Sequence, residues 1–137
     1  MTELVKTARP LPAGLGRLVG AFRNSIAGLR HAVRNEAAFR QELIAAALLF
    51  VPALVLPVAR VERLVLILSM LLVMVVELLN SAIEATVDRI GPERHPLSGL
   101  AKDLGSAAVA IALVMSIACW VVIAGPTLVD VLAGAAG

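Results

Sequence analysis

The sequence predicts an all-α membrane protein, in which an amphipathic surface helix precedes three membrane-spanning helices. Of the 137 residues, 60% are hydrophobic and only 16% are charged. Soluble domains average about 45–50% apolar and about 25% charged residues. The apolar residues also gather in three long stretches, which a soluble fold of this length would leave largely exposed to water. The composition therefore excludes a soluble globular domain and a disordered chain.

The three apolar stretches predict spans over residues 43–59, 64–87 and 104–124. A membrane-spanning helix needs about 20 residues, within a range of about 17–25. Pro52 and Pro57 interrupt the first stretch, and Gly125 and Pro126 are expected to end the third. The second stretch reaches the required length only by including two carboxylates and an amide. We expect a single domain over residues 1–137.

A helix over residues 13–34 is predicted to be amphipathic and to lie in the membrane interface. Its apolar residues recur mostly at steps of three and four, the period of one helical face; they are Leu15, Leu18, Val19, Phe22, Ile26, Leu29 and Val33. Such a helix buries its apolar face at the acyl boundary and keeps its arginines near anionic headgroups. A helix that packs on a soluble partner is the alternative, which the three spans that follow make less favourable.

The basic residues predict the orientation in the membrane. Ten of the 12 Lys and Arg lie before residue 42 or within residues 88–103, and the other two are Arg60 and Arg63. Because basic residues are enriched in cytoplasmic loops, we expect the N-terminus and the 88–103 loop to lie in the cytoplasm. Three spans then place the C-terminus on the opposite side.

The second span carries the residues most suited to chemistry. Glu77, Asn80, Glu84 and Asp88 stand at i, i+3, i+7 and i+11, so they fall within an arc of about 80° on one helical face. A charge near the bilayer centre costs at least about 2.5–3.5 kcal/mol, so this polar stripe must face a partner helix or a wet cleft. Polar residues also hold membrane helices together, but three carboxylates repel one another without a cation. A functional site is therefore favoured.

Two further clusters are placed to meet this stripe. Carboxylates are ligands that Mg²⁺ prefers, and Glu36 and Glu84 are both expected near the cytoplasmic interface, where they can share one ion. Lys102 and Asp103 begin the third span, and the N-terminus of a helix favours an anion such as phosphate.

Neither histidine fits an H-E-x-x-H zinc pattern, and one cysteine cannot build a thiolate site. No Walker A sequence or protein-kinase motif set is present, and the three Phe, one Trp and no Tyr leave little for stacking nucleic-acid bases.

Three blocks of sequence resemble a known family. They read NEAAFRQE at 35–42, VELLNSAIEATVDRIG at 76–91 and HPLSGLAKDLGSAA at 95–108. Their order and spacing resemble the prokaryotic diacylglycerol kinase family, from about Arg17 to Trp120. The resemblance implies a homotrimeric enzyme of the bacterial inner membrane, with its C-terminus in the periplasm. It also implies that the enzyme transfers the γ-phosphate of MgATP to the 3-hydroxyl of sn-1,2-diacylglycerol and makes phosphatidic acid.

The resemblance also implies roles for individual residues. Glu77 matches the catalytic base, Asn80 a polar active-site position, and Glu36 and Glu84 the ligands of Mg²⁺. The positions that match ATP contacts are Arg17, Asn24, Glu36, Glu84, Glu93, Arg94, His95, Lys102 and Asp103. The positions that match lipid contacts are Arg17, Arg30, Ala38, Arg40, Gln41, Glu42, Glu77 and Ser106. Asn24 and Ile26 stand where the best-known members have aromatic residues.

Two alternatives remain open. Undecaprenol kinase is a related enzyme with a different lipid acceptor, and the block at 35–42 is more similar to the diacylglycerol branch. A non-enzymatic oligomer, such as a small pore with the polar stripe along a proton path, belongs to another class. The clustering of the carboxylates in one half of the second span disfavours a pore.

Overall fold

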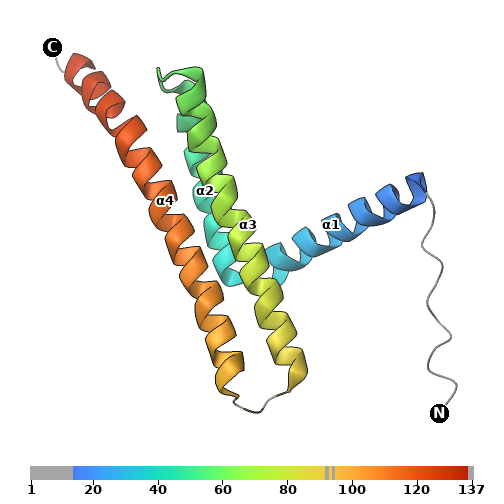
Figure 1. The fold of residues 1–137 in the computed structure, drawn as a ribbon. Helices are drawn as coiled ribbons and strands as arrows, with labels where there is room; N and C mark the ends of the chain where they lie inside the picture. The colour runs from blue at the N-terminus through green and yellow to red at the C-terminus, as the bar shows by residue number, and fades with distance from the viewer. Residues whose placement is uncertain (1–13, 92, 94, 136–137) are drawn as a thin grey trace, which may run out of the picture. The chain divides into compact units, whose positions relative to one another are not determined.

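The computed structural model describes residues 14–91, 93 and 95–135, and these form four α-helices and no strand. The helices are α1 (Leu15–Asn35), α2 (Ala37–Val55), α3 (Arg60–Ile90) and α4 (Pro96–Ala135) (Figure 1). Three of them, α2, α3 and α4, are long and apolar enough to cross a membrane. The all-α class and the presence of three long apolar helices are therefore confirmed.

The helix α1 belongs to the first of two compact units, and the second unit begins at Glu36. The seven apolar residues that predicted an amphipathic helix all lie within α1, and all seven are exposed. The largest, Phe22, is 69% exposed. The last turn contains Arg34, whose positive charge suits the negative end of the helix dipole. The helix thus presents an apolar stripe without covering it, as an interfacial helix does.

The helix α2 runs through Pro52 and ends at Val55. The amide of Leu56 still donates to the carbonyl of Pro52 at 3.0 Å. The helix stops before Pro57 because a proline disfavours helical geometry in the residue that precedes it. Its 19 residues span about 28 Å at 1.5 Å per residue, just the thickness of a bilayer core. The residues after Val55, up to Ala59, form the turn into α3.

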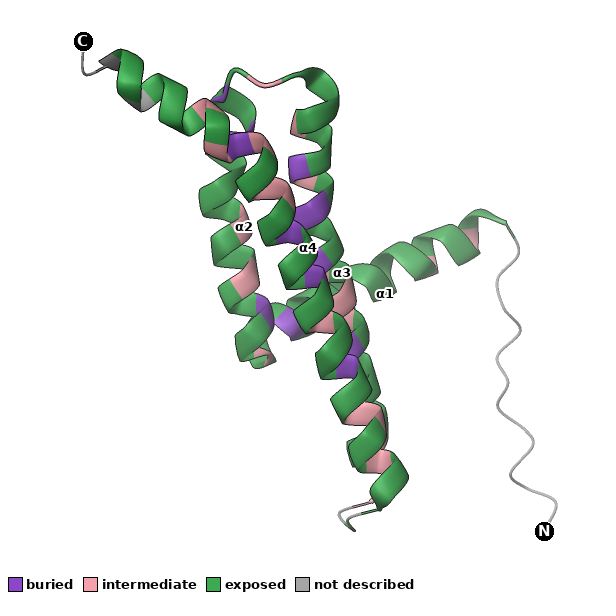
Figure 2. Cartoon of the chain, turned by 60° about the vertical axis from the view of Figure 1, so that its left-hand side comes forward, coloured by how far each residue is buried: buried purple, intermediate pink, exposed green. Residues whose placement is uncertain are grey.

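The helix α3 is the centre of the second unit and packs against both α2 and α4. Its buried residues include Leu66, Met70, Val73, Glu77 and Asn80, which follow one another at alternating steps of four and three. This is the spacing of a coiled-coil seam, and Figure 2 shows the buried positions along one line of the helix. Leu66 and Met70 of this seam join Ala53 of α2 in a core cluster against which Trp120 packs.

The helix α4 begins at Pro96 and continues through Gly125 and Pro126 to Ala135. We expected these two residues to end the helix near residue 124, and the structure differs. A proline removes one backbone donor from a helix, and membrane helices tolerate that loss. The hydroxyl of Thr127 donates to the carbonyl of Ile123 at 3.3 Å in the same turn.

Small residues form the buried face of α4 that meets α3. They are Gly105, Ala112, Ser116 and Ala124. Small side chains let helices approach closely in lipid. Between the two helices, the hydroxyls of Ser69 and Ser116 lie 3.3 Å apart. Since the Ser69 hydroxyl also donates to the Leu66 carbonyl at 2.8 Å, Ser116 is the donor to Ser69.

Candidate active site

The polar stripe on α3 passes from the interior of the bundle to its surface. Glu77 is 4% exposed and Asn80 is 8% exposed, whereas Glu84 is half-buried and Asp88 is exposed. The side-chain amide of Asn80 donates to Oε1 of Glu84 at 3.1 Å. The structure therefore confirms that these residues share one helical face, and it shows that the stripe faces other helices at its deeper end.

Four carboxylates gather around the buried part of this stripe. Glu77 experiences electrostatic repulsion from Glu84 and from Glu36, and Glu42 experiences repulsion from Glu77. We call Glu36, Glu42, Glu77 and Glu84 the carboxylate cluster. Glu36 stands directly before α2, and Glu42 lies one and a half turns into it. The start of α2 and the second half of α3 thus bring together acidic residues that are 35 positions or more apart in the sequence.

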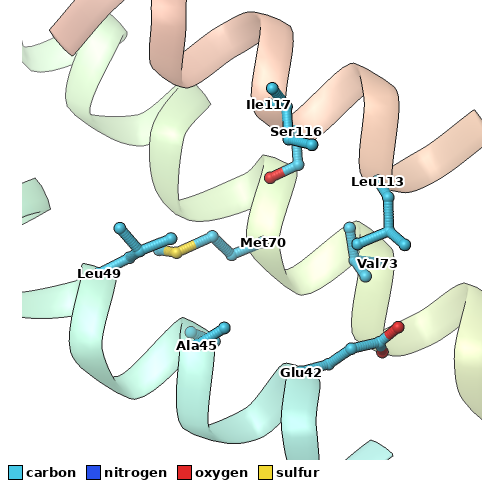
Figure 3. Close-up of a pocket in the computed structure, with 9 residues that line it drawn as sticks. Glu42, Ala45, Leu49, Met70, Val73, Leu113, Ser116 and Ile117 are labelled. Atoms are coloured by element: carbon cyan, nitrogen blue, oxygen red, sulfur yellow. The ribbon is translucent and has the colours of Figure 1, made fainter. Parts of the chain in front are cut away.

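A small apolar cavity adjoins the carboxylate cluster. It has a volume of about 180 Å³ and lies between α2, α3 and α4, with Met70, Val73, Leu113 and Ser116 in its wall. Glu42 is its one charged residue, and Figure 3 shows the Glu42 side chain extending from α2 toward Val73. Oε2 of Glu42 is buried and accepts no hydrogen bond from the described part of the chain. An unmatched acceptor at the end of an apolar cavity is suited to a molecule with an apolar body and a hydroxyl.

A second group of polar residues lies where α3 ends and α4 begins. Nζ of Lys102 and Oδ1 of Asp88 form an ion pair at 2.5 Å. Nδ1 of His95 accepts a hydrogen bond from the amide of Leu97 at 3.2 Å, so His95 caps α4. Lys102, Asp88, His95 and Glu93 line a hollow of about 380 Å³. This hollow holds both signs of charge at the N-terminus of α4, and the positive end of a helix dipole suits an anion such as phosphate.

Most of the remaining predicted site residues are exposed. Asp103 and Ser106 on α4 and Ala38, Arg40 and Gln41 at the start of α2 are exposed. Arg17, Asn24 and Arg30 are exposed on α1, in the other compact unit. Arg94 lies outside the described residues. These positions stay predictions.

The carboxylates near Glu77 can be compared with the ligands that Mg²⁺ needs. No three His, Cys, Asp or Glu side chains of the described ranges form a group that holds an ion by itself. Mg²⁺ needs only one or two protein carboxylates when substrate phosphates and waters complete its octahedron. Glu36 and Glu84, which both act on Glu77, fit that donor set.

Two contacts between α3 and α4 did not follow from the sequence. They are the hydrogen bond from Ser116 to Ser69 and the ion pair of Lys102 with Asp88. The signal for the first was a serine flanked by apolar residues in each of two stretches, at positions 69 and 116. For the second, the sequence showed both charges at the helix ends but not their pairing.

Comparisons with known proteins find similar sequences in one family. Residues 23–124 match the family described as "Prokaryotic diacylglycerol kinase". The chain is 54% identical over 110 residues to a diacylglycerol kinase of Escherichia coli K12, covering 80% of this chain and 90% of that protein. It is 51% identical to a diacylglycerol kinase of Pseudomonas aeruginosa, covering 80% of this chain and 89% of that protein. A Helicobacter pylori diacylglycerol kinase is 43% identical, with 81% and 87% covered.

Proposed function

Because this chain belongs to the prokaryotic diacylglycerol kinase family, we propose that it phosphorylates the 3-hydroxyl of sn-1,2-diacylglycerol with ATP and makes phosphatidic acid. The chain is a kinase and a multi-pass membrane protein with three apolar helices. The observation that carries the proposed reaction is the placement of Glu77, a carboxylate buried in a membrane helix beside three others.

Glu77 acts as the general base in this proposal. It accepts the proton of the lipid hydroxyl while the hydroxyl oxygen forms a bond to the γ-phosphorus of ATP. The bond between that phosphorus and the bridging oxygen to the β-phosphate breaks, and ADP leaves with its electrons. Phosphoryl transfer of this kind depends on positioning and on neutralised charge. In this proposal, a lipid hydroxyl reaches Glu77 from within the membrane.

Glu36 and Glu84 would hold Mg²⁺ together with the phosphates of ATP. The repulsion within the carboxylate cluster supports this role, since a cation in that place would relieve it. Bound Mg²⁺ neutralises charge on the β- and γ-phosphates. Asn80 keeps one oxygen of Glu84 in a hydrogen bond, and Glu84 lies nearer than Glu77 to the end of α3, where phosphates stay hydrated.

Lys102 is proposed to neutralise a phosphate of ATP at the N-terminus of α4. It now pairs with Asp88, and an incoming phosphate would compete with that carboxylate for the ammonium group. Glu93, Arg94, His95 and Asp103, with Arg17 and Asn24 of α1, complete the proposed nucleotide contacts. The hollow at the α3–α4 loop supports this location.

Lipid contacts are proposed for the start of α2 and for α1. Glu42 at the apolar cavity would accept a hydrogen bond from the glycerol part of the lipid, and the cavity wall would meet an acyl chain. Arg17 and Arg30 of the amphipathic α1 lie where an interfacial helix meets headgroups. Ala38, Arg40, Gln41 and Ser106 complete this set.

We further propose a homotrimer in the inner membrane, with a cytoplasmic N-terminus and a periplasmic C-terminus. The distribution of ten basic residues against two supports the orientation. The trimer is supported by the small interior of three spans: Glu84 is only half-buried within one chain, and a second chain would close the outer side of the site.

The direct test is a phosphorylation assay of purified protein in mixed detergent–lipid micelles. MgATP is supplied with either diacylglycerol or undecaprenol, and the phosphorylated lipid is separated and identified. We expect phosphatidic acid from diacylglycerol at a much higher kcat/KM. Exclusive phosphorylation of undecaprenol would overturn the proposed substrate, and no phosphorylation of either lipid would overturn the proposed function.

A further inference from the structure

Gly105 occupies a position at which a side chain would strike another residue. A Cβ built on Gly105 would collide with Oδ1 of Asn80 and lie 3.3 Å from its Cγ. At Gly99 and Gly125 of the same helix, a Cβ would meet nothing within 4 Å. Gly105 therefore marks a close approach of α4 to the polar stripe of α3.

One hydrogen bond and one steric contact fix the Asn80 amide at this crossing. Its nitrogen donates to Oε1 of Glu84 at 3.1 Å. Its oxygen is buried and has no hydrogen-bond donor among the described residues, and it fills the space that Gly105 leaves. Because the amide is planar, its oxygen and nitrogen turn together. An atom that displaces the oxygen therefore also withdraws the nitrogen from Glu84.

We propose that Gly105 is a positioning residue for the kinase reaction, because it leaves the space in which the Asn80 amide holds the Glu84 carboxylate. This inference rests on the proposed role of Glu84 in binding Mg²⁺ with ATP. Gly105 contacts neither substrate; it acts through Asn80. A substitution at Gly105 should consequently weaken the binding of MgATP and leave the binding of the lipid substrate unchanged.

The fold around the crossing has room for the displaced amide. Asn80 and Gly105 both line an open surface hollow of about 530 Å³, whose other lining residues are apolar: Val76, Leu79, Ile83, Ala101, Leu104 and Ala108. A methyl group at position 105 would turn the Asn80 side chain toward this hollow. The helices then keep their packing, and the hydrogen bond to Glu84 is what the protein loses.

The test compares Gly105→Ala with Gly125→Ala, which adds the same methyl group to the same helix in open space. Steady-state kinetics at varied MgATP and varied diacylglycerol are combined with equilibrium binding of a non-hydrolysable MgATP analogue. For Gly105→Ala we expect the KM for MgATP and the Kd of the analogue to rise about tenfold, the effect of one lost hydrogen bond. The KM for diacylglycerol should remain unchanged, and Gly125→Ala should match the wild type.

A double-mutant cycle separates positioning from packing. Asn80→Ala removes the group that the new methyl would strike, so Gly105→Ala should have no further effect in that background, on Kd or on folding. Three outcomes would overturn the inference. Gly105→Ala could weaken analogue binding equally in the wild-type and Asn80→Ala backgrounds, or it could cause misfolding in both backgrounds. Wild-type behaviour of the Gly105→Ala variant would overturn it as well. Failure of the proposed function has a different signature, since the wild-type protein itself would then not phosphorylate diacylglycerol.

Discussion

Glu77 is the residue on which the chemistry depends. A carboxylate that is 4% exposed has lost most of its water, and burial disfavours its charged form. Two neighbouring carboxylates add repulsion. A site with this cost is seldom structural, because an apolar residue would stabilise the helix packing better. The arrangement makes sense when a cation and a proton donor arrive with the substrates.

Substitution of Glu36 or Glu84 tests where the cation binds. Glu36→Gln and Glu84→Gln should each raise the Mg²⁺ concentration for half-maximal activity by at least about tenfold, the lower bound for residues that only support a metal ligand. Folding should survive, because an amide costs less to bury than a carboxylate. The measurement is activity against Mg²⁺ at constant ATP.

The matched control is Glu62→Gln. Glu62 caps the start of α3, where its carboxylate accepts a hydrogen bond from the amide of Ala59 at 2.8 Å, at the opposite end of the helix from the carboxylate cluster. This variant should need no more Mg²⁺ than the wild type. A normal Mg²⁺ requirement for Glu36→Gln or Glu84→Gln would remove that residue from the proposed metal site.

At the scale of the helices, polar pairs help to hold α3 against α4. Ser116→Ala removes the hydrogen bond to Ser69 but leaves Ser69 bonded to the Leu66 carbonyl, so no buried hydroxyl is left unpaired. The expected loss is about 0.6 kcal/mol in the free energy of unfolding, the average for such bonds between membrane helices. Unfolding in mixed micelles by a denaturing detergent measures it.

Ser25→Ala provides the comparison for Ser116→Ala. The Ser25 hydroxyl is exposed on α1 and bonds the carbonyl of Ala21 within its own helix. Its replacement should leave the free energy of unfolding within experimental error of the wild type. Equal stability of the Ser116→Ala and Ser25→Ala variants would mean that the contact between α3 and α4 contributes nothing.

The sequence predicted the helices better than the contacts between them. Periodicity placed the polar stripe of α3 on one face, and the apolar stretches located the three spans. The helix end expected at Gly125 and Pro126 was wrong, because membrane helices tolerate the one missing donor. The pairing of Ser116 with Ser69, of Lys102 with Asp88 and of Gly105 with Asn80 depends on how far α4 slides and turns along α3. Many registers satisfy the same apolar pattern, so the sequence leaves that choice open.

At the scale of the whole molecule, orientation is testable with single cysteines. Cys119 is the only native cysteine and is first replaced by alanine. Ala59→Cys, in the turn before α3, should react with a membrane-impermeant maleimide in intact cells. Leu97→Cys, in the first turn of α4, should react only after permeabilisation. The opposite pattern would reverse the proposed orientation.

The proposed trimer predicts a mass. Light scattering in detergent, corrected for bound detergent, should give three times the chain mass of 14.3 kDa. Exposed apolar residues run along α2, α3 and α4, and subunit contacts would cover part of them. A monomer that retains full activity would show that one chain completes the site, and the trimer proposal would fall.

The most direct test of the central claim compares Glu77→Gln with Glu84→Gln. The two residues lie seven positions apart, about 10 Å along the helix, and only Glu77 is buried. Turnover is measured with diacylglycerol, and a non-hydrolysable MgATP analogue is titrated onto each variant. Glu77→Gln should lower kcat by about 10²–10⁴-fold, the usual loss for a general base, with analogue binding close to wild type. Glu84→Gln should lose analogue binding as well. Equal loss of binding in both variants would contradict the account, because Glu77 would then belong to the metal site and would not be the base.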